Sequence, residues 1–421
     1  MDESHMNKKE MVNGTAVSRW YLIYLVVLMG LIALMDQYLS TVKTTAIPYI
    51  LKEYSITASQ FSWWEALYMI PTFFIFLLNG LNDIIGRKLA ILVLILLMGF
   101  SSLGITLFAS SFHLFMLFYA VVVFTTVSNM WSIPVTEESP PEKRARLVTI
   151  TYILGLIPLQ AILPPILINT LGLDWKWIYG VMFVFMIPVI VLWFFMRETK
   201  RYQLLKEERK KGVKKHHFFG LGAINRRDVR YIVMAAAIWA SWLVTGFLFM
   251  MAGHYFMDLH HYSLSRWSLV LLSTLIATMI GGLAGGWAMD KIGRGKALSM
   301  GCVGLAISLS LMGFLPENLL PFDAPVAGFF ISFVYSWIIV YVPEIFPTER
   351  RGSCMGWTTT TARVSYIIGP VTAAVLLQSF PKMDWFWVAA GLIMLIPIAV
   401  IALFKPYETR VKELEEIEEK R

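Results

Sequence analysis

Apolar stretches of about 20 residues recur along the whole chain, and each is long enough to cross the hydrocarbon core of a bilayer. In lipid, backbone polar groups must be hydrogen-bonded within the protein, which leaves helices or a closed barrel. The stretches lack the period-two alternation of barrel strands. We therefore expect an all-α membrane protein with twelve transmembrane helices, at 20–46, 61–82, 89–110, 112–134, 147–170, 177–196, 230–252, 267–289, 297–315, 322–343, 353–378 and 384–404.

Two unrelated polar signatures each occur twice, and in both cases the copies are 207 residues apart. The first has the form Asp-x-x-Gly-Arg and closes the second helix of each set of six. The second has the form Glu-x-x-Pro-x-x-x-Arg. A shared long period indicates two copies of one design, which is the internal symmetry expected of a secondary transporter. The signature residues are Asp83, Gly86, Arg87, Glu137 and Arg144 in the first copy and Asp290, Gly293, Arg294, Glu344 and Arg351 in the second.

The repeat divides the chain into two six-helix bundles, at 20–196 and 230–404, which we expect to be pseudo-symmetric. A basic segment at 197–229 joins them, and short segments at 1–19 and 405–421 flank them. With the N-terminus inside, 30 of the 36 lysines and arginines fall on the inner side and five on the outer side. This asymmetry predicts that both termini are cytoplasmic, and we expect the protein to lie in the plasma membrane.

Composition excludes several classes of protein. The net charge of +8 could suggest nucleic acid, but 57% of the residues are hydrophobic and the basic residues fall between the apolar stretches, so we expect no nucleic-acid partner. The sequence has no phosphate-binding loop, Cys-x-x-Cys or His-Glu-x-x-His motif, and we expect neither an enzyme nor a cofactor. The cluster of His254, Asp258, His260 and His261 has no spacing typical of zinc sites, and we expect no metal.

The repeated signatures predict a latch at the cytoplasmic end. Glycine permits a tight turn in a short loop. The acid and the arginine of the first signature can form charge-assisted hydrogen bonds with each other or with the second signature. Such a cluster would hold the inner side shut in one state and break when that side opens. The alternative is that these residues only fix topology and pack the loops.

Charged residues inside the predicted helices are the best guide to chemistry, because each is costly in lipid and usually faces a cavity. Asp36 lies within the first helix, and Lys43 follows it by seven residues, which is two turns and therefore the same face. Arg363 lies near the middle of the eleventh helix. Glu65 lies near the outer end of the second helix, where we expect water to reach it.

Over essentially its whole length the chain resembles the major facilitator superfamily. The stretch from Gly286 to Lys296 matches the loop signature of that family, while Asn79 replaces the usual glycine in the first copy. The stretch from Pro343 to Gly352 resembles the motif that follows the tenth helix in sugar, organic-ion and aromatic-acid porters. The stretches Arg197–Lys200 and Tyr407–Arg410 resemble the Pro-Glu-Thr/Ser signature that ends helices six and twelve.

Two further resemblances concern cargo. Asp36-Gln37-Tyr38-Leu39, followed by Pro48, resembles a pattern of aromatic-acid and related proton symporters, although Leu39 replaces its second acid. Arg363 with its neighbours and Gly369-Pro370 resembles the eleventh helix of the organic-anion and aromatic-acid branch, where that arginine is associated with anionic substrates. Sugar porters are less similar, because their paired glutamines in helix seven and their usual arginine in helix four are missing.

These observations predict proton-coupled symport of a small organic anion, such as a carboxylate or aromatic acid, by alternating access. Asp36 would carry the proton, because a carboxyl group partly removed from water binds protons more tightly. Positive side chains would hold the anion, and polar and aromatic side chains would line the same cavity. The predicted substrate-binding residues are Arg363, Lys43, Tyr38, Gln160, Tyr335 and Trp337.

Each assignment has an alternative. Asp36 could form a permanent salt bridge with Lys43, Lys43 could extend outward to water, and Arg363 could serve helix packing. The aromatic residues could belong to the core or to the interfacial belt. For the whole protein, the alternatives are a sugar or neutral-metabolite porter, a cationic-drug/proton antiporter, or a membrane sensor that does not transport.

The expected partners are therefore a small-molecule substrate, protons and the lipid bilayer. The run from Gly281 to Gly286 contains two overlapping Gly-x-x-x-Gly pairs, which permit close contact between helices. We expect that contact to join the two bundles rather than two chains, and we expect the protein to be a monomer.

Overall fold

The computed structural model describes residues 18–408, apart from 75–77, 79–83, 127, 129, 141–143, 201, 204–205, 208–224 and 347–350. The described part of the chain is helical and contains no strand. Ten of its helices are long and apolar enough to cross a membrane, and the helix Phe112–Thr126 is shorter but equally apolar. The all-α prediction is confirmed.

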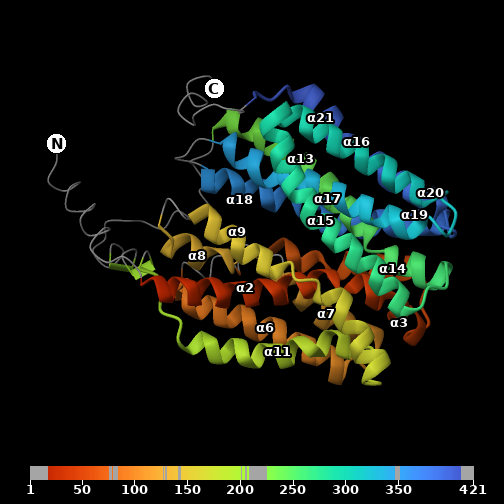
Figure 1. The fold of residues 1–421 in the computed structure, drawn as a ribbon, viewed down its shortest axis with the longest axis horizontal. Coiled ribbons are helices and arrows are strands. Elements are labelled where there is room, and N and C mark those ends of the chain that lie inside the picture. Colours follow the sequence, from red (N-terminus) through yellow and green to blue (C-terminus); the bar gives the residue numbers. More distant parts are fainter. Residues whose placement is uncertain are drawn as a thin grey trace.

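The first half was predicted to contain six spans, and several of them are interrupted. Proline and short turns divide some spans, so that one predicted helix often corresponds to two shorter elements (Figure 1). The elements are α2 (Arg19–Thr41), α3 (Lys43–Glu53), α4 (Ala58–Tyr68), the 3-10 helix η1 (Ile70–Phe74), α6 (Arg87–Phe108), α7 (Phe112–Thr126), α8 (Ser132–Glu138), α9 (Arg144–Gly155), α10 (Leu159–Pro165), the π-helix η2 (Ile166–Thr170) and α11 (Trp177–Phe194).

The second half repeats this pattern after the joining segment. Its eleventh predicted span is interrupted between α18 and α19, and its twelfth between α20 and α21. The elements are α13 (Arg226–Phe249), α14 (Ala252–His254), the π-helix η4 (Tyr255–Leu259), α15 (Leu264–Ile292), α16 (Arg294–Met312), α17 (Leu320–Glu344), α18 (Arg351–Ala362), α19 (Ser365–Ser379), α20 (Asp384–Ile393) and α21 (Ile396–Phe404).

The glycine-rich part of α15 packs against α17 within the second half. A Cβ atom on Gly281 would lie 2.0 Å from the carbonyl oxygen of Phe329, and one on Gly285 would lie 2.6 Å from that of Phe333. The expectation that these glycines join the two halves is therefore wrong. Small residues allow two helices of the same half to approach closely, as they do in many membrane bundles.

The two halves contact each other at one end of the bundle. We call the end where α2 begins and α21 ends the terminal end, and the other the opposite end (Figure 1). At the opposite end, the backbone N–H of Gly253 in α14 donates to the Thr44 hydroxyl of α3 at 3.3 Å, and the Ser59 hydroxyl of α4 donates to the carbonyl of Ala374 in α19 at 3.0 Å. These contacts hold the halves together at that end.

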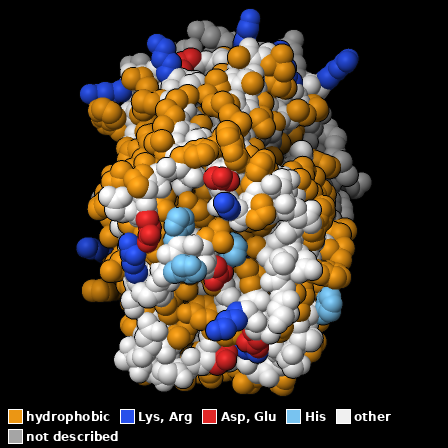
Figure 2. Space-filling view, turned by 90° about the vertical axis from the view of Figure 1, so that its right-hand side faces the viewer, with side chains coloured by type: hydrophobic (Ala, Val, Ile, Leu, Met, Phe, Trp, Pro, Cys, Tyr) orange, Lys and Arg blue, Asp and Glu red, His pale blue; other side chains and the backbone are white. Residues whose placement is uncertain are grey.

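Polar side chains also gather at the opposite end, where Figure 2 shows acidic, basic and histidine side chains near the middle of the face. They include the exposed pair Arg266–Glu317, at 3.5 Å, and the pair formed by His254 Nδ1 and Asp258 Oδ2, at 2.6 Å. Among the described residues there is no group of three or more side chains placed to hold a metal ion.

Candidate functional site

Asp36 lies in α2 and is 1% exposed. One carboxylate oxygen accepts a hydrogen bond from Gln37 Nε2 at 3.1 Å. The indole of Trp131 is its other polar neighbour, although Nε1 of that indole lies outside hydrogen-bonding geometry with any described acceptor. Among the residues that the structure describes, no lysine or arginine pairs with this carboxylate.

Tyrosine side chains of both halves interact electrostatically with the Asp36 carboxylate. The hydroxyls of Tyr152 in the first half and of Tyr335 and Tyr366 in the second all lie close enough to feel its charge. Tyr335 also stacks on Trp242, with ring centroids 4.8 Å apart.

Arg363 lies at the interruption between α18 and α19 and is 5% exposed. Its backbone N–H still donates to the carbonyl of Thr359 at 3.1 Å, whereas that of Val364 reaches Thr361 at 3.3 Å, so the helix tightens there. The charge of Arg363 acts on the hydroxyl of Tyr366, which also feels the charge of Asp36. Tyr366 thus connects the predicted proton carrier of the first half with the predicted anion-binding residue of the second.

Lys43 is buried and paired, but not with Asp36. Its Nζ lies 2.7 Å from Glu65 Oε1, and the two side chains are 3% and 1% exposed. A salt bridge between Lys43 and Asp36 is therefore wrong, as is the extension of Lys43 to water. The expectation that water reaches Glu65 is also wrong, because helix packing encloses both members of the pair.

The remaining predicted lining residues are all buried or half-buried. The Tyr38 hydroxyl donates to the carbonyl of Ile178 in α11 at 2.6 Å, within the first half. Gln160 Oε1 and Trp337 Nε1 are buried and make no hydrogen bond among the described residues. Because a buried polar group without a partner is costly, these two atoms remain candidates for contact with cargo.

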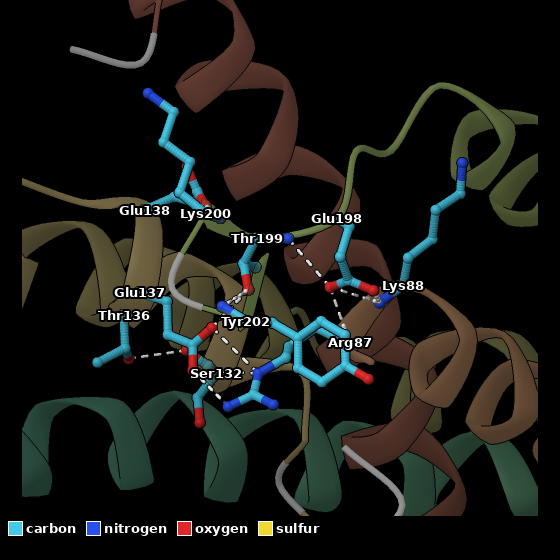
Figure 3. A network of polar contacts seen from close by, with 10 residues as sticks. All are labelled: Arg87, Lys88, Ser132, Thr136, Glu137, Glu138, Glu198, Thr199, Lys200 and Tyr202. Atoms are coloured by element: carbon cyan, nitrogen blue, oxygen red, sulfur yellow. Dashed lines mark hydrogen bonds and ion pairs between the residues drawn. The ribbon is translucent and has the colours of Figure 1, made fainter. Parts of the chain in front are cut away.

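At the terminal end of the first half, the repeated signatures form one network (Figure 3). Arg87 Nη2 donates to Glu137 Oε1 at 2.8 Å, and the Arg87 backbone N–H donates to Glu198 Oε1 at 2.9 Å. Thr199 Oγ1 donates to Glu137 Oε2 at 2.6 Å. The network joins the start of α6, the end of α8 and the segment that follows α11.

The second half repeats this network with equivalent residues. Arg294 donates through Nη2 to Glu344 Oε1 at 3.0 Å and through Nη1 to Asp290 Oδ1 at 2.8 Å. Its backbone N–H donates to Glu408 Oε2 at 2.9 Å. The side-chain hydrogen bonds from Arg87 to Glu137 and from Arg294 to Glu344 thus keep the 207-residue spacing, whereas Glu198 and Glu408 are 210 residues apart. Asp83 lies outside the described residues, as do the side chains of Arg144 and Arg351.

The glycine of each signature makes room for a carboxylate at the start of a helix. Gly86 has φ +98° and Gly293 has φ +93°, a region that only glycine adopts readily. A Cβ atom would lie 2.2 Å from Glu198 Oε2 in the first case and 2.7 Å from Glu408 Oε2 in the second. A carboxylate at that place is favourable, since helix N-termini attract negative charge.

Sequence reasoning missed Glu198 and Glu408 as members of these networks. A usable signal was present, because each glutamate is followed by threonine and the two pairs stand at matching places after the last helix of each half. The contacts named above join residues of the same half. Whether the networks also act as a latch between the halves stays a prediction.

A family model described as "Major Facilitator Superfamily" matches residues 26–322 and 269–421. The two matches together cover nearly the whole chain, and the chain belongs to this family of membrane transporters. It is a transporter and not an enzyme, and the family fold confirms the prediction of twelve helices in two six-helix bundles.

Two of the curated relatives below are named as transport proteins. The chain is 24% identical over 388 residues to YwtG of Bacillus subtilis, which is named as a metabolite transport protein, with 80% of this chain and 81% of that protein covered. It is 32% identical over 147 residues to the synaptic vesicle 2-related protein of Rattus norvegicus, covering 35% of this chain. It is also 32% identical over 108 residues to the cis,cis-muconate transport protein of Acinetobacter baylyi, covering 25% of this chain. Each of the last two matches spans only 26% of the relative.

Solved structures share the fold. The inward-open xylose transporter XylE of E. coli superposes with a TM-score of 0.72 at 17% identity, covering 95% of this chain and all of that one. A bacterial homologue of the human lysosomal transporter Spinster, inward-facing and occupied, gives 0.65 at 14% identity, covering 92% of this chain and 98% of that one. These likenesses concern architecture alone.

Proposed function

We propose that this protein is a proton-coupled symporter of a small organic anion, a carboxylate or an aromatic acid, that works by alternating access. The observation that carries the proposal is the burial of two charged residues, Asp36 in α2 of the first half and Arg363 between α18 and α19 of the second, which are 1% and 5% exposed. A buried acid of one half and a buried base of the other are the groups that such a cycle requires.

Asp36 is suited to carry the proton. Its carboxylate is buried with a neutral amide and an indole as polar neighbours and without a cation among the described residues. A buried charge without compensation is strongly unfavourable, and uptake of a proton removes that charge. When the site opens to water the proton can leave, which is the cycle that coupling requires.

Arg363 is suited to hold the anion. Guanidinium groups bind carboxylates through paired, charge-assisted hydrogen bonds. Its place at an interrupted helix is typical of transporter binding sites, where broken helices line the cavity at the bundle centre. The rings of Trp242, Tyr335 and Tyr366 nearby favour a planar, partly apolar cargo.

The proposal includes an orientation in the plasma membrane, with the terminal end and both termini facing the cytoplasm. The excess of basic residues on that side supports it. The contacts between the halves at the opposite end, through Thr44 with Gly253 and Ser59 with Ala374, then close the outer side. We propose that the protein acts as a monomer, since alternating access needs only the two halves of one chain.

The decisive experiment is a thermal-shift screen of purified protein with benzoate, cis,cis-muconate, succinate and xylose, at acidic and neutral pH. A ligand that binds only the folded protein raises Tm. At a hundredfold excess over Kd it increases the free energy of unfolding by about 2.7 kcal/mol. We expect a carboxylate to raise Tm more at acidic pH, where a protonated Asp36 no longer repels it. Arg363→Ala should remove the shift, and Arg266→Ala, an exposed arginine of the opposite end, should keep it.

Asp36→Asn separates the proton from the anion. This variant should bind the carboxylate as tightly at neutral pH as the wild type does at lower pH, and its binding should depend less on pH. A shift with xylose alone would favour the sugar-porter alternative. A carboxylate shift that survives Arg363→Ala would contradict the proposed binding residue.

A further inference from the structure

Lys43, predicted from the sequence to bind substrate, is paired with Glu65, and the pair has no role in the function proposed above. It joins the start of α3 to α4 in the first half, and both side chains are almost fully enclosed. Tyr119 Oη of α7 donates to the same Glu65 oxygen, Oε1, at 3.3 Å. Purely structural ion pairs are costly to bury, because both ions lose their hydration.

The hydrogen-bonding capacity of this pair is only partly used. Glu65 Oε2 is buried and accepts no hydrogen bond from any described residue. An ammonium group has three donors, and among the described residues Glu65 is the one hydrogen-bond partner of Lys43. Among the described residues, Lys43 therefore has N–H donors without an acceptor, and Glu65 Oε2 is an acceptor without a donor.

The pair also lies against the seam between the two halves. The ring of Phe247, in α13 of the second half, lies 5.2 Å from Lys43 Nζ. The next residue, Thr44, makes the contact with Gly253 that closes the opposite end. Phe247 in turn packs edge-on against Tyr366, with centroids 5.1 Å apart, and Tyr366 is the tyrosine that feels the charge of Arg363.

We propose that Lys43 and Glu65 form a second anion subsite, in which a substrate carboxylate replaces Glu65 on Lys43 while Glu65 takes up a proton. The proposal rests on the anion symport proposed above and adds a site at the seam, ahead of Arg363 on the path from the opposite end. An aromatic pair, Phe247 and Tyr366, separates the two cations, so the cargo can pass from one to the other along ring faces.

The exchange keeps the charge balanced. Before it, the ammonium of Lys43 is neutralised by the carboxylate of Glu65. The ionic contact between them breaks, a new one forms between Lys43 and the substrate carboxylate, and a proton from water at the opposite end binds Glu65. One negative and one positive charge enter together, so the buried site remains neutral.

Among the described residues, Lys43 of α3, Tyr119 of α7 and Tyr179 of α11 interact with Glu65. The helix α19, which packs against α4, carries Tyr366. The tyrosines are neutral near physiological pH. Protonation of Glu65 would let its carboxyl group keep the contact with Tyr119 after Lys43 has turned to the substrate.

The test measures proton uptake when benzoate binds, with a pH-indicator dye and weakly buffered protein in detergent at neutral pH. We expect proton uptake by the wild type and by Asp36→Asn, and reduced uptake by Glu65→Gln. The double variant Asp36→Asn/Glu65→Gln should take up no proton. Glu65→Gln should also bind benzoate about tenfold more tightly, because nothing then competes for Lys43. Glu317→Gln, which alters an exposed pair at the opposite end, is the matched control and should behave as the wild type.

Several outcomes would overturn the proposal. If Glu65→Gln keeps the wild-type uptake and affinity, the pair is structural. If Glu65→Gln does not fold, the neutral double variant Lys43→Gln/Glu65→Gln takes its place, and wild-type uptake there would equally contradict the subsite. The proposed function fails separately, when the wild type binds none of benzoate, muconate or succinate.

Discussion

At the scale of single residues, the charges inside the bundle divide into a paired and an unpaired set. Lys43 finds Glu65, whereas Asp36 has only neutral polar neighbours among the described residues. This division assigns different tasks to side chains that look alike in the sequence. Glu65 has a lysine beside it, and Asp36 has no such cation among the described residues.

The pairing of Lys43 was not predictable from periodicity. Seven residues after Asp36, it falls on the same face of a continuous helix. The helix instead ends at Thr41 and begins again at Lys43. Lys43, at the start of α3, pairs with Glu65 of α4. By contrast, the burial of Asp36 and Arg363 could be predicted. A charged side chain within an apolar span is costly in lipid and therefore faces the interior of the bundle.

The two positive-φ glycines give a prediction at this scale. Gly86→Ala should lower the stability of the protein by at least about 1–2 kcal/mol, because an L residue is strained in that backbone region and its Cβ would collide with Glu198. Gly293→Ala should act in the same direction. Gly295→Ala, whose Cβ would meet nothing within 4 Å, is the control. Thermal unfolding in detergent measures all three, and equal Tm values would contradict the account.

At the scale of elements, the helices were largely predictable and their interruptions were not. Long apolar stretches identify spans, since hydropathy depends on composition. The break at Arg363 has no proline or glycine at that position that would have predicted it. The helix that packs against the glycine-rich stretch of α15 was not predictable either. A glycine such as Gly281 indicates that another helix approaches closely, but not which one.

The contact between α15 and α17 can be tested by adding bulk. Gly281→Leu should destabilise the second half by about 1–3 kcal/mol or more, as overpacking does, because its Cβ would fall 2.0 Å from a carbonyl oxygen. Gly286→Leu changes the same helix in the same way, but its Cβ would meet nothing within 4 Å. Only the first variant should show a lower Tm, and equal effects would place the tight contact elsewhere.

At the scale of the whole molecule, the halves touch at the opposite end and each is internally tied at the terminal end. Alternating access requires that the first set of contacts breaks during transport. The spacing of 207 residues made the two-fold design predictable, whereas the state that the molecule adopts depends on contacts between halves that no periodic pattern encodes.

A reversible cross-link tests this arrangement. Ser59 Oγ lies 3.0 Å from the carbonyl oxygen of Ala374, so cysteines at both positions should form a disulfide across the seam. Oxidised Ser59→Cys/Ala374→Cys protein in liposomes should lose benzoate uptake, and reductant should restore it. Ser59→Cys alone should transport in both conditions. Undiminished uptake by the oxidised double variant would mean that the opposite end does not open there.

The carboxylates of Glu198 and Glu408 each accept hydrogen bonds from the first turn of a helix of their own half. These contacts brace the two halves separately, and we call each half a lobe and each set of contacts a brace. Damage to one brace should loosen one lobe and leave its twin intact. The molecule would then favour one side of the membrane at rest instead of losing its ability to cycle, and an asymmetric transporter would arise from a symmetric plan.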